Sequence, residues 1–461
     1  MPLLPCMFQM TDGRKSRPPI LANTSIPKPL ILHPLMISTC HAIHKQPYGL
    51  AVLARAVFQG ECLSVYADEL SRRLTADPHD AGALLDVAIL HMLNGNHAYG
   101  IVSQQHAFEI CRTYRKMPAR VSSEPRRLLV LSIAGELMAN MPIDLLLHNT
   151  TFVVDTIYLD AGGPLPTNLP DRDVTLVAIA HATSNASTLA LLTNWEEVYS
   201  RPLVCDPARV LELSRETLWL KLANCAGLRI PPTYGVSRRE LESDWHTTSP
   251  GFHFPIIVRP IDSHAGIGLE KLDAPASLTR YLASNPADSY YVSPFIDYSD
   301  HAGVYCKFRI ALIQGAPYAC HAAYSRHWMV HYLNANMDND IGKQQAEELF
   351  FFTFDSFRQK HAMAFGEIHS RLALDYIVLD CAEMSTGELL IFEADTGMLV
   401  HNLENEQMFP YKAKQMSMVF DAFERMLVRV AEGTPPQLAL GGAGDLPVTV
   451  TDGSCGPTES L

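Results

Sequence analysis

Strands and helices alternate between residues 125 and 205, and this alternation restricts the possible folds more than any other feature of the sequence. Residues 128–133 form a buried apolar run, and "TFVVDTIYLD" and "DVTLVAIAHAT" are two further strand-like segments. The helical segment "NASTLALLTNWEEV" follows them. Because parallel strands must be joined by a crossover, usually a helix, the pattern predicts a parallel α/β domain over residues 125–205.

The composition indicates a folded protein without broad polyanion binding. Hydrophobic residues make up 48% of the 461 residues, and 36 Lys and Arg against 49 Asp and Glu give a net charge of −13. This charge argues against nucleic-acid or anionic-membrane partners. The ten cysteines form no C-x-x-C pair, as is typical of free thiols in the cytoplasm. No uncharged apolar run reaches the roughly 18 residues of a membrane helix, and the N-terminal residues lack the order of a secretory signal. We therefore expect a cytoplasmic protein.

The N-terminal part of the chain is helical in pattern. Residues 1–35 are rich in Pro and basic residues, residues 433–461 are rich in Gly, Pro, Ser and Thr, and we expect both ends to be disordered. Residues 36–124 show apolar spacings of three and four, interrupted by "DPHD" and "NGN". Short helix pairs of this kind resemble tetratricopeptide repeats, but a plain helical bundle fits equally well. This region could bind a peptide or carrier partner, or hold a homodimer together.

Residues 206–432 predict a second domain of the α+β type. Ser214 is a candidate N-cap for a helix that ends before Gly227. Two β-hairpins are expected, one turning at Gln314 and Gly315 and the other at residues 385–387. A long helical segment separates the hairpins, and a closing helix follows the second one.

Three carboxylates converge on the second hairpin. Asp380 ends one strand, and Glu393 and Asp395 lie two residues apart on its partner, on one face and about 7 Å apart. Carboxylates gathered in this way repel one another unless a cation is present, and hard oxygen ligands suit Mg²⁺ shared with phosphates. Two such ions would fit the same trio. A solvated hairpin face is the alternative.

A glycine-containing loop follows the strand "FPIIVRP". Arg259 places a permanent positive charge at the strand end, and Ser263, Gly266 and Gly268 allow backbone N–H groups to approach an anion. His264 could donate to a phosphate. The loop is therefore a candidate lid over phosphates, although an ordinary hairpin turn remains open.

Two cations alternate on the strand "CKFRIALIQG". Lys307 and Arg309 share one face, and inside a β-rich core they need anionic partners. A phosphate or a substrate carboxylate would satisfy them, and so would a structural salt bridge. The preceding segment "YYVSPFID" could serve as a linker whose backbone groups contact adenine.

Histidines crowd the segment "HAAYSRHWMVHYLNANM". His327 and His331 have the spacing of a zinc pair on a helix, but no third ligand follows. A substrate-facing cluster with an anion-binding His321 or His331 is the alternative, and plain packing is a third.

The order of these elements resembles the ATP-grasp superfamily with its glutathione synthetase-like ATP-binding fold. "FPIIVRP" is similar to the strand that carries the α-phosphate cation, "IDSHAGIG" to the phosphate-covering loop, and "IVLD" with "IFEAD" to the magnesium ligands. The resemblance covers about residues 125–430. It implies an α/β and α+β protein with an N-terminal TPR-like helical region over 36–124, a Rossmann-like pre-ATP-grasp domain over 125–205, and a two-subdomain ATP-grasp domain over 206–432.

The resemblance also implies a set of site residues. ATP would be bound by the residues Arg215, Arg259, Ser263, His264, Gly266, Gly268, Pro294, Phe295, Ile296 and Asp297. Two Mg²⁺ ions would be held by Asp380, Glu393 and Asp395. The catalytic residues would be Arg309, Lys307 and His331, and the substrate-binding residues His321, Arg326, Trp328 and His331.

Three positions depart from the family pattern. Arg259 stands where Lys is usual, Asp395 where Asn is usual, and Val378 where an Arg is usual, so that Arg309 would take over the role of that arginine. The implied activity is an ATP- and Mg²⁺-dependent ligation of a carboxylate to an amine or thiol through an acyl phosphate, on small molecules or a peptide. A kinase on the same fold and a non-enzymatic scaffold remain alternatives.

Overall fold

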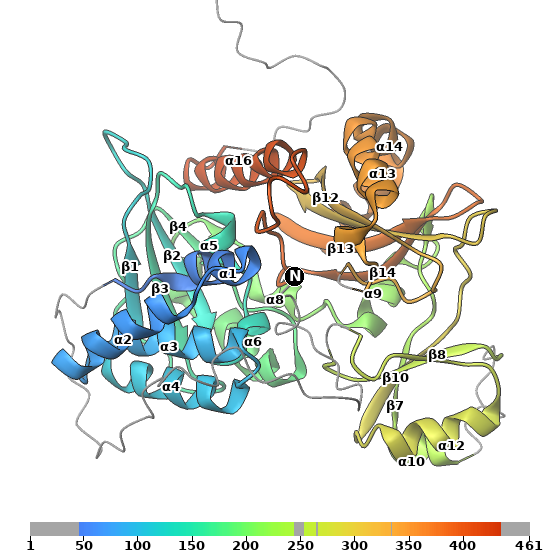
Figure 1. Ribbon diagram of the computed structural model, residues 1–461, viewed down its shortest axis with the longest axis horizontal. Coiled ribbons are helices and arrows are strands. Elements are labelled where there is room, and N and C mark those ends of the chain that lie inside the picture. The colour runs from blue at the N-terminus through green and yellow to red at the C-terminus, as the bar shows by residue number, and fades with distance from the viewer. Residues whose placement is uncertain (1–45, 244–252, 264–265, 333, 435–461) are drawn as a thin grey trace, which may run out of the picture.

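The computed structural model describes residues 46–243, 253–263, 266–332 and 334–434. Apart from Gly433 and Thr434, the two ends that we expected to be disordered lie outside these residues. Three β-sheets and their helices form the described part of the chain, with the N-terminal helices beside the first sheet and the other two sheets on the far side (Figure 1).

The N-terminal region is a small helical bundle. It consists of α1 (Gly49–Gln59), α2 (Ser64–Ala76), α3 (Ala81–Leu93) and α4 (His97–Ile110). Asp80 caps α3 by accepting from the backbone N–H of Ala83, and its carboxylate also pairs with the buried Arg73 at 2.8 Å. Every residue of α3 is buried, so α3 is the central helix of the bundle. Whether the helices form tetratricopeptide repeats stays a prediction.

The helical pattern expected up to residue 124 ends earlier than predicted. Residues Thr113–Lys116 form strand β1, which pairs antiparallel with β3 (Val153–Leu159). Arg115 of β1 pairs with the buried Asp155 of β3, with Nε and Oδ1 2.7 Å apart. The helical prediction was wrong here because residues 113–116 pair with a strand 40 residues away. The spacing of apolar residues along the sequence gives no information about such a distant partner.

The first sheet confirms the predicted parallel α/β domain. Its strand order is β1-β3-β2-β4-β5, and β3, β4 and β5 continue the parallel pairing that starts at β2. The elements of this part are β2 (Arg127–Ile133), η1 (Leu137–Ala139), α5 (Ile143–Leu146), β4 (Val174–Val177), η2 (Thr183–Asn185), α6 (Ala186–Thr193), α7 (Glu196–Tyr199), β5 (Leu203–Val204) and α8 (Pro207–Val210).

A small antiparallel sheet carries the glycine-containing loop. Its order is β7-β10-β8-β9, with β7 (Tyr234–Ser237), β8 (Ile256–Pro260), β9 (Glu270–Leu272) and β10 (Ser289–Pro294). Helices α10 (Arg238–Glu242) and α12 (Pro275–Ser284) cover it, and the buried rings of Tyr281 and Tyr290 form much of its core.

The large sheet carries the two predicted hairpins, and both are confirmed. Its order is β12-β11-β13-β14-β6, with β6 (Leu228–Arg229), β11 (Tyr305–Ile313), β12 (Ala316–Ser325), β13 (Tyr376–Glu383) and β14 (Leu389–Asp395). Ser214 caps α9 (Arg215–Leu222) as predicted, since its hydroxyl accepts from the N–H of Thr217 at 3.1 Å. The helix ends at Leu222, one turn before the predicted end.

The long helical segment between the hairpins is divided into three helices. These are α13 (Ile341–Phe352), α14 (Phe354–Lys360) and α15 (Ala362–Leu372), which follow η3 (Met337–Asn339). The closing helix α16 (Lys412–Ala431) lies across the top of the view, between the first sheet and the large sheet (Figure 1). One apolar core joins the two sheets through α16. Within the described ranges, no helix is both long and apolar enough to cross a bilayer.

Candidate functional site

Asp380 lies at the centre of a buried ion-pair cluster on the large sheet. It is directly opposite Arg309 in the register of β13 and β11. Its Oδ2 accepts from Lys307 Nζ at 2.8 Å and from Arg309 Nη2 at 3.0 Å, and its Oδ1 accepts from Arg309 Nε at 2.8 Å. Burial would raise the pKa of Asp380, but the charges of Arg309 and Lys307 outweigh it and hold the pKa well below the usual value. Of the partners that the sequence left open for Lys307 and Arg309, the structure shows a carboxylate salt bridge.

The other two predicted metal ligands lie on the neighbouring strand. Glu393 is opposite Asp380 in the register of β13 and β14, and its Oε1 pairs with Arg215 Nη2 at 2.8 Å. Arg215 also donates from Nη1 to the carbonyl of Phe392 at 2.7 Å. Burial would raise the pKa of Glu393, but Arg215 and Arg259 outweigh it, and the pKa is lowered. Arg215 therefore ties helix α9 to the carboxylate hairpin.

Asp395 is a buried carboxyl group next to the negative charge of Glu393. Its Oδ1 accepts from the N–H of Gly397 at 2.6 Å. Burial raises the pKa of Asp395 to about 7, and the negative charge of Glu393 adds to the rise. A carboxyl group in this position is stabilised in its ionised form by a nearby cation, which is the chemistry expected of a metal ligand.

The three carboxylates are not gathered around one point in this arrangement. No group of three or more His, Cys, Asp or Glu side chains among the described residues could hold a metal ion. The residue types and the register suit Mg²⁺, since Asp380 and Glu393 are opposite each other and Asp395 lies two residues beyond. Asp380, however, has both oxygens occupied by cations. The metal assignment therefore stays a prediction that requires Asp380 to change partners.

Arg259 is a buried cation with neutral partners. It is 9% exposed, and its guanidinium donates to the hydroxyl of Ser263 at 3.1 Å and to the Ser263 carbonyl. In the described part of the chain, no carboxylate lies within ion-pair distance of it. Burial lowers the pKa of Arg259 to about 10, and the like charge of Arg215 contributes. Because a buried cation needs a counter-charge, this strand end suits an anionic ligand.

The loop after Arg259 has the backbone geometry expected of a glycine turn. Gly266 and Gly268 have φ of 77° and 64°, in the left-handed region that favours glycine. A Cβ at Gly268 would lie 2.7 Å from Cδ of Pro260, so only glycine fits there. His264 lies outside the described residues, and its predicted role is untested.

The α/β domain contacts Asp262, before this loop, and Gly397, after the carboxylate hairpin. Asp262, next to the loop, accepts from the N–H of Thr183 at 3.1 Å. On the carboxylate hairpin, a Cβ at Gly397 would clash with Ala180. The α/β domain thus contacts residues next to both the small sheet and the large sheet near the candidate site.

The predicted linker follows strand β10 directly. β10 ends at Pro294, and Lys271 Nζ lies 4.2 Å from the centre of the Phe295 ring. The ring of Trp328 meets Phe295 edge to face, with ring centres 5.8 Å apart. Asp297 accepts from the N–H of Ser299, which lowers its pKa. Trp328, which the sequence assigned to the substrate, therefore lies beside the linker, of which Ile296 is a part.

The histidine-rich segment does not form the helix that a zinc pair would need. His327 lies in a bend after β12 and His331 in irregular chain, both outside any helix. Arg326 is exposed and donates to the carbonyl of Ala302 at 3.2 Å. Burial, together with the charges of Lys307 and Arg309, lowers the pKa of His331 to about 4. His331 is therefore neutral and close to the cations of the Asp380 cluster.

His321 lies on the same side of the sheet as Arg309. The two residues are opposite each other in the register of β11 and β12, and the His321 ring stacks on Tyr332 with centres 4.9 Å apart. Its buried Nε2 has no hydrogen-bond partner among the described residues. Burial and the charges of Arg309 and Lys412 hold the pKa of His321 well below its usual value.

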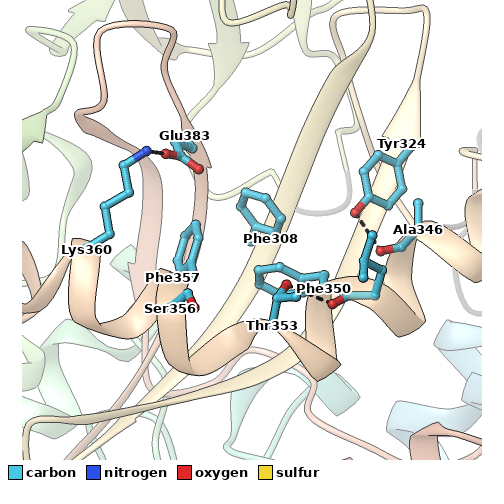
Figure 2. Close-up of a pocket in the computed structure, with 10 residues that line it drawn as sticks. Phe308, Tyr324, Ala346, Phe350, Thr353, Ser356, Phe357, Lys360 and Glu383 are labelled. Carbon is cyan, nitrogen blue, oxygen red and sulfur yellow. Dashed lines mark hydrogen bonds and ion pairs between the residues drawn. The ribbon is translucent and has the colours of Figure 1, made fainter. Parts of the chain in front are cut away.

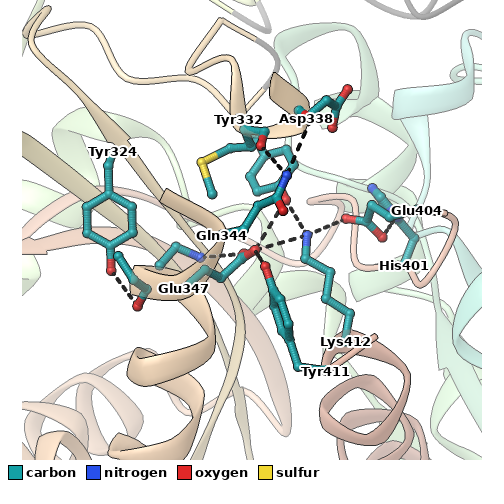
Figure 3. Close-up of polar contacts among 12 residues, drawn as sticks. Tyr324, Tyr332, Asp338, Gln344, Glu347, His401, Glu404, Tyr411 and Lys412 are labelled. Carbon is teal, nitrogen blue, oxygen red and sulfur yellow. Dashed lines mark hydrogen bonds and ion pairs between the residues drawn. The ribbon is translucent and has the colours of Figure 1, made fainter. Parts of the chain in front are cut away.

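Sequence reasoning missed a second buried ion cluster, centred on Lys412 (Figure 3). Lys412 is 1% exposed and pairs with Glu404 at 2.7 Å and Glu347 at 3.5 Å. Its Nζ donates to the hydroxyl of Tyr332 and lies 4.2 Å from the centre of that ring. Tyr411 donates to Glu347 at 2.9 Å. The only available signal was a lysine at the first position of an amphipathic helix, which is an ordinary surface pattern.

A pocket of about 400 Å³ lies on the opposite face of the large sheet (Figure 2). Phe308 lines it, and as the residue between Lys307 and Arg309 it points away from Asp380. The other lining residues come from β12, β13 and the helices α13 and α14: Tyr324, Ala346, Leu349, Phe350, Thr353, Ser356, Phe357, Lys360 and Glu383. This aromatic pocket is separate from the candidate site.

Comparisons with known proteins give structural similarity without a family match. No family model and no curated protein matches the chain. Among solved structures, the chain is similar to the D-alanine–D-alanine ligase from Coxiella burnetii, with 12% identity, a TM-score of 0.43 and coverage of 67% of this chain and 96% of that one. It is also similar to an ATP-grasp RimK-domain protein from Sphaerobacter thermophilus, with 12% identity, a TM-score of 0.39 and coverage of 66% and 99%.

A third similar structure is the D-alanine–D-alanine ligase from Bacillus anthracis complexed with ATP. The identity is 14%, the TM-score is 0.40, and the match covers 68% of this chain and 99% of that one.

Proposed function

We propose that this chain is an ATP-dependent ligase of the ATP-grasp type that joins a carboxylate to an amine or thiol. The observation that carries the proposal is the buried Arg259, which has no acidic partner among the described residues and lies at a strand end before a glycine turn. Arg215 is close enough to lower its pKa. Arg215 is itself paired with Glu393, so Arg259 is the cation that needs a counter-charge, and a polyphosphate arriving from outside would supply it.

The remaining residues have roles that follow from their positions. Arg259, Arg215, Lys307 and Arg309 would contact phosphate oxygens, and Phe295 at the end of β10 would lie against the adenine. The glycine turn would close over the phosphates and exclude water. Asp380, Glu393 and Asp395 are the candidate Mg²⁺ ligands, and the ion would neutralise charge on the transferring phosphoryl group.

The proposed reaction has two steps that balance in atoms and charge. A carboxylate oxygen of the substrate attacks the γ-phosphorus, and the bond to the β-phosphate oxygen breaks to give an acyl phosphate and ADP. The amine nitrogen then attacks the acyl carbon, phosphate leaves, and the nitrogen loses a proton. Fixed cations such as Arg309 stabilise the oxygen charge in both steps, so catalysis consists mainly of positioning and electrostatics.

Turnover tests the proposal directly. Purified protein is incubated with MgATP and pools of carboxylic acids, with and without pools of amines, and ADP release is measured. We expect one acid pool to support ADP release that needs an amine for full rate. Glu393→Gln should abolish it, whereas Glu388→Gln, at the turn of the same hairpin, should leave it unchanged. ADP release with a phosphorylated product and no amine requirement would contradict the ligase in favour of a kinase.

A further inference from the structure

An irregular segment between β14 and α16 contributes side chains to two apolar cores. Met398 and Val400 are 7% and 1% exposed and belong to the core that joins the first sheet to the large sheet. Leu403 is 1% exposed and belongs to the core of the N-terminal helical bundle, against which the partly buried Leu399 also packs. Residues 398–404, which we call the bridging segment, therefore lie between the bundle and the large sheet.

The bundle side of the bridging segment faces α1 and α3. The cluster that contains Leu403 also contains Leu53 of α1 and Leu90 of α3, and neither of these is more than 1% exposed. The ring of His401 meets the ring of Phe58 of α1, with ring centres 5.3 Å apart. Because the bridging segment forms neither helix nor strand, its position depends on this side-chain packing.

The other side of the bridging segment holds two cations near the candidate site. Arg309 Nη1 donates to the carbonyl of Leu399 at 2.9 Å, while Nε and Nη2 contact Asp380. Lys412 Nζ donates to Glu404 at 2.7 Å (Figure 3). The bundle is therefore connected through one short segment to a cation of each buried ion cluster.

The contacts of Arg309 allow it to bind a ligand without leaving its partners. Its guanidinium has five N–H bonds, and the contacts with Asp380 and Leu399 use three of them. Within the described ranges, the protein does not use the other two. Asp380 and Leu399 hold the guanidinium from two sides, so the position of Leu399 helps to set the direction of the remaining N–H bonds. A displacement of about 1 Å can cost a catalytic group about a hundredfold in rate, so small shifts of Leu399 are sufficient to be measured.

We propose that the N-terminal helical bundle positions Arg309 through the bridging segment, with Leu399 and Leu403 as positioning residues. This proposal rests on the function proposed above, because it assigns the fixed charge of Arg309 to the transferring phosphoryl group. The bundle is then part of the catalytic unit and not a separate module joined to it. Leu403 contacts no reacting atom and acts by keeping Leu399 in place.

Leu403→Ala tests the proposal because it weakens the packing on the bundle side without touching Arg309. In the full chain, hydrogen–deuterium exchange of residues 398–404 measures the mobility of the bridging segment. Steady-state ADP release, with the acid and amine pools that support turnover, gives kcat and KM for MgATP. We expect exchange in Leu403→Ala to be about tenfold faster and kcat to be at least about tenfold lower. KM for MgATP should change by less than about twofold, because Arg259 and Arg215 keep their contacts.

Two further variants separate positioning from general destabilisation. Leu403→Met keeps nearly the same apolar volume and should restore both exchange and kcat to within about twofold of the wild type. Leu85→Ala is the matched control, because Leu85 is 6% exposed on α3 but belongs to another cluster, with Phe108 of α4. It should leave a cavity of similar size in the bundle, with unchanged exchange in residues 398–404 and kcat within about twofold of the wild type.

The outcomes distinguish this inference from the proposed function. If Leu403→Ala leaves either exchange or kcat unchanged, or if Leu85→Ala lowers kcat as much, Leu403 has no positioning role and the proposal is refuted. A rise in KM at constant kcat would refute it as well. If Leu403→Ala does not fold, Leu403→Val replaces it, with an expected fall in kcat of about threefold. If the wild type releases no ADP with any pool, the proposed function itself fails, and the positioning role with it.

Discussion

Two arginines of the candidate site, Arg309 and Arg259, are in opposite electrostatic situations. Arg309, on the large sheet, contacts the carboxylate of Asp380 through two nitrogens. Burial would lower its pKa, but the charge of Asp380 outweighs it and the pKa is raised. Arg259, on the small sheet, hydrogen-bonds neutral groups of Ser263 and no acid among the described residues, and burial lowers its pKa to about 10. We call the large-sheet half of the site compensated, because its arginine has an acidic partner within the protein. The small-sheet half is uncompensated, because Arg259 has no such partner among the described residues.

This difference assigns different tasks to the two halves. Removing a cation that is paired with an internal carboxylate leaves a buried acid without a counter-charge, which is strongly destabilising. A cation without one contributes little to stability and is available to an external anion. Substitutions that remove one charge at a time should therefore separate effects on stability from effects on binding.

The largest expected effect is on the most buried of the compensated cations, Lys412. Lys412→Met leaves Glu347 and Glu404 buried with no cation between them, and should lower the free energy of unfolding by about 3–5 kcal/mol. Urea unfolding measures the loss. Lys414→Met, on the exposed side of the same helix, should change it by less than about 0.5 kcal/mol. Similar losses for both variants would show that the cluster does not stabilise the fold.

A direct comparison of the two arginines should give the next largest effect. Arg309→Gln leaves Asp380 with Lys307 alone and should cost about 2–3 kcal/mol of unfolding free energy. Arg259→Gln removes only bonds to neutral groups and should cost about 1 kcal/mol or less. Equal losses in urea unfolding would contradict the division into two halves.

Burial and the charges of Lys307 and Arg309 should also make the free energy of unfolding depend on pH through His331. Its folded pKa of about 4 is lower than that of an unfolded histidine, so the neutral form is favoured in the native state. The stability from this preference is complete above the unfolded pKa and is lost as pH falls toward 4. From pH 7 to pH 4, the wild type should lose about 2 kcal/mol relative to His331→Gln, measured by urea unfolding at each pH. A constant difference between the two proteins would refute the shift.

The smallest expected effect lies in the glycine turn of the uncompensated half. Gly268→Ala combines a positive φ with a close contact to Pro260, and should cost about 2 kcal/mol. Gly387→Ala, in a turn with positive φ and open space, should cost about 1 kcal/mol. Thermal unfolding of the two variants gives the comparison. If Gly268→Ala is the milder change, the turn is not tightly packed against Pro260.

The strands, hairpins and the Ser214 cap could be predicted because they depend on local signals. Alternation along the strands and turn residues at Gln314 and Gly315 are recorded within a few positions of the chain. The strand Thr113–Lys116 could not be predicted in this way, because its identity depends on a distant partner strand.

The acidic partners of the site's cations are set by how distant strands pair, which the sequence does not show locally. The sequence indicated that Lys307 and Arg309 need an anion but could not choose between phosphate and carboxylate. The choice is made by the pairing of β11 with β13, which places Arg309 opposite an acid 71 residues away. For the same reason Trp328, assigned to the substrate by its histidine-rich neighbours, lies against Phe295 at the linker.

The measurement that tests the central claim most directly is a calorimetric titration of the protein with AMP-PNP and Mg²⁺, in the wild type and in Arg259→Gln. We expect magnesium-dependent binding in the wild type that weakens about tenfold or more in the variant, while its unfolding free energy stays within about 1 kcal/mol. Equal affinities in the two proteins, or no binding in either, would contradict the assignment of Arg259 to a nucleotide phosphate.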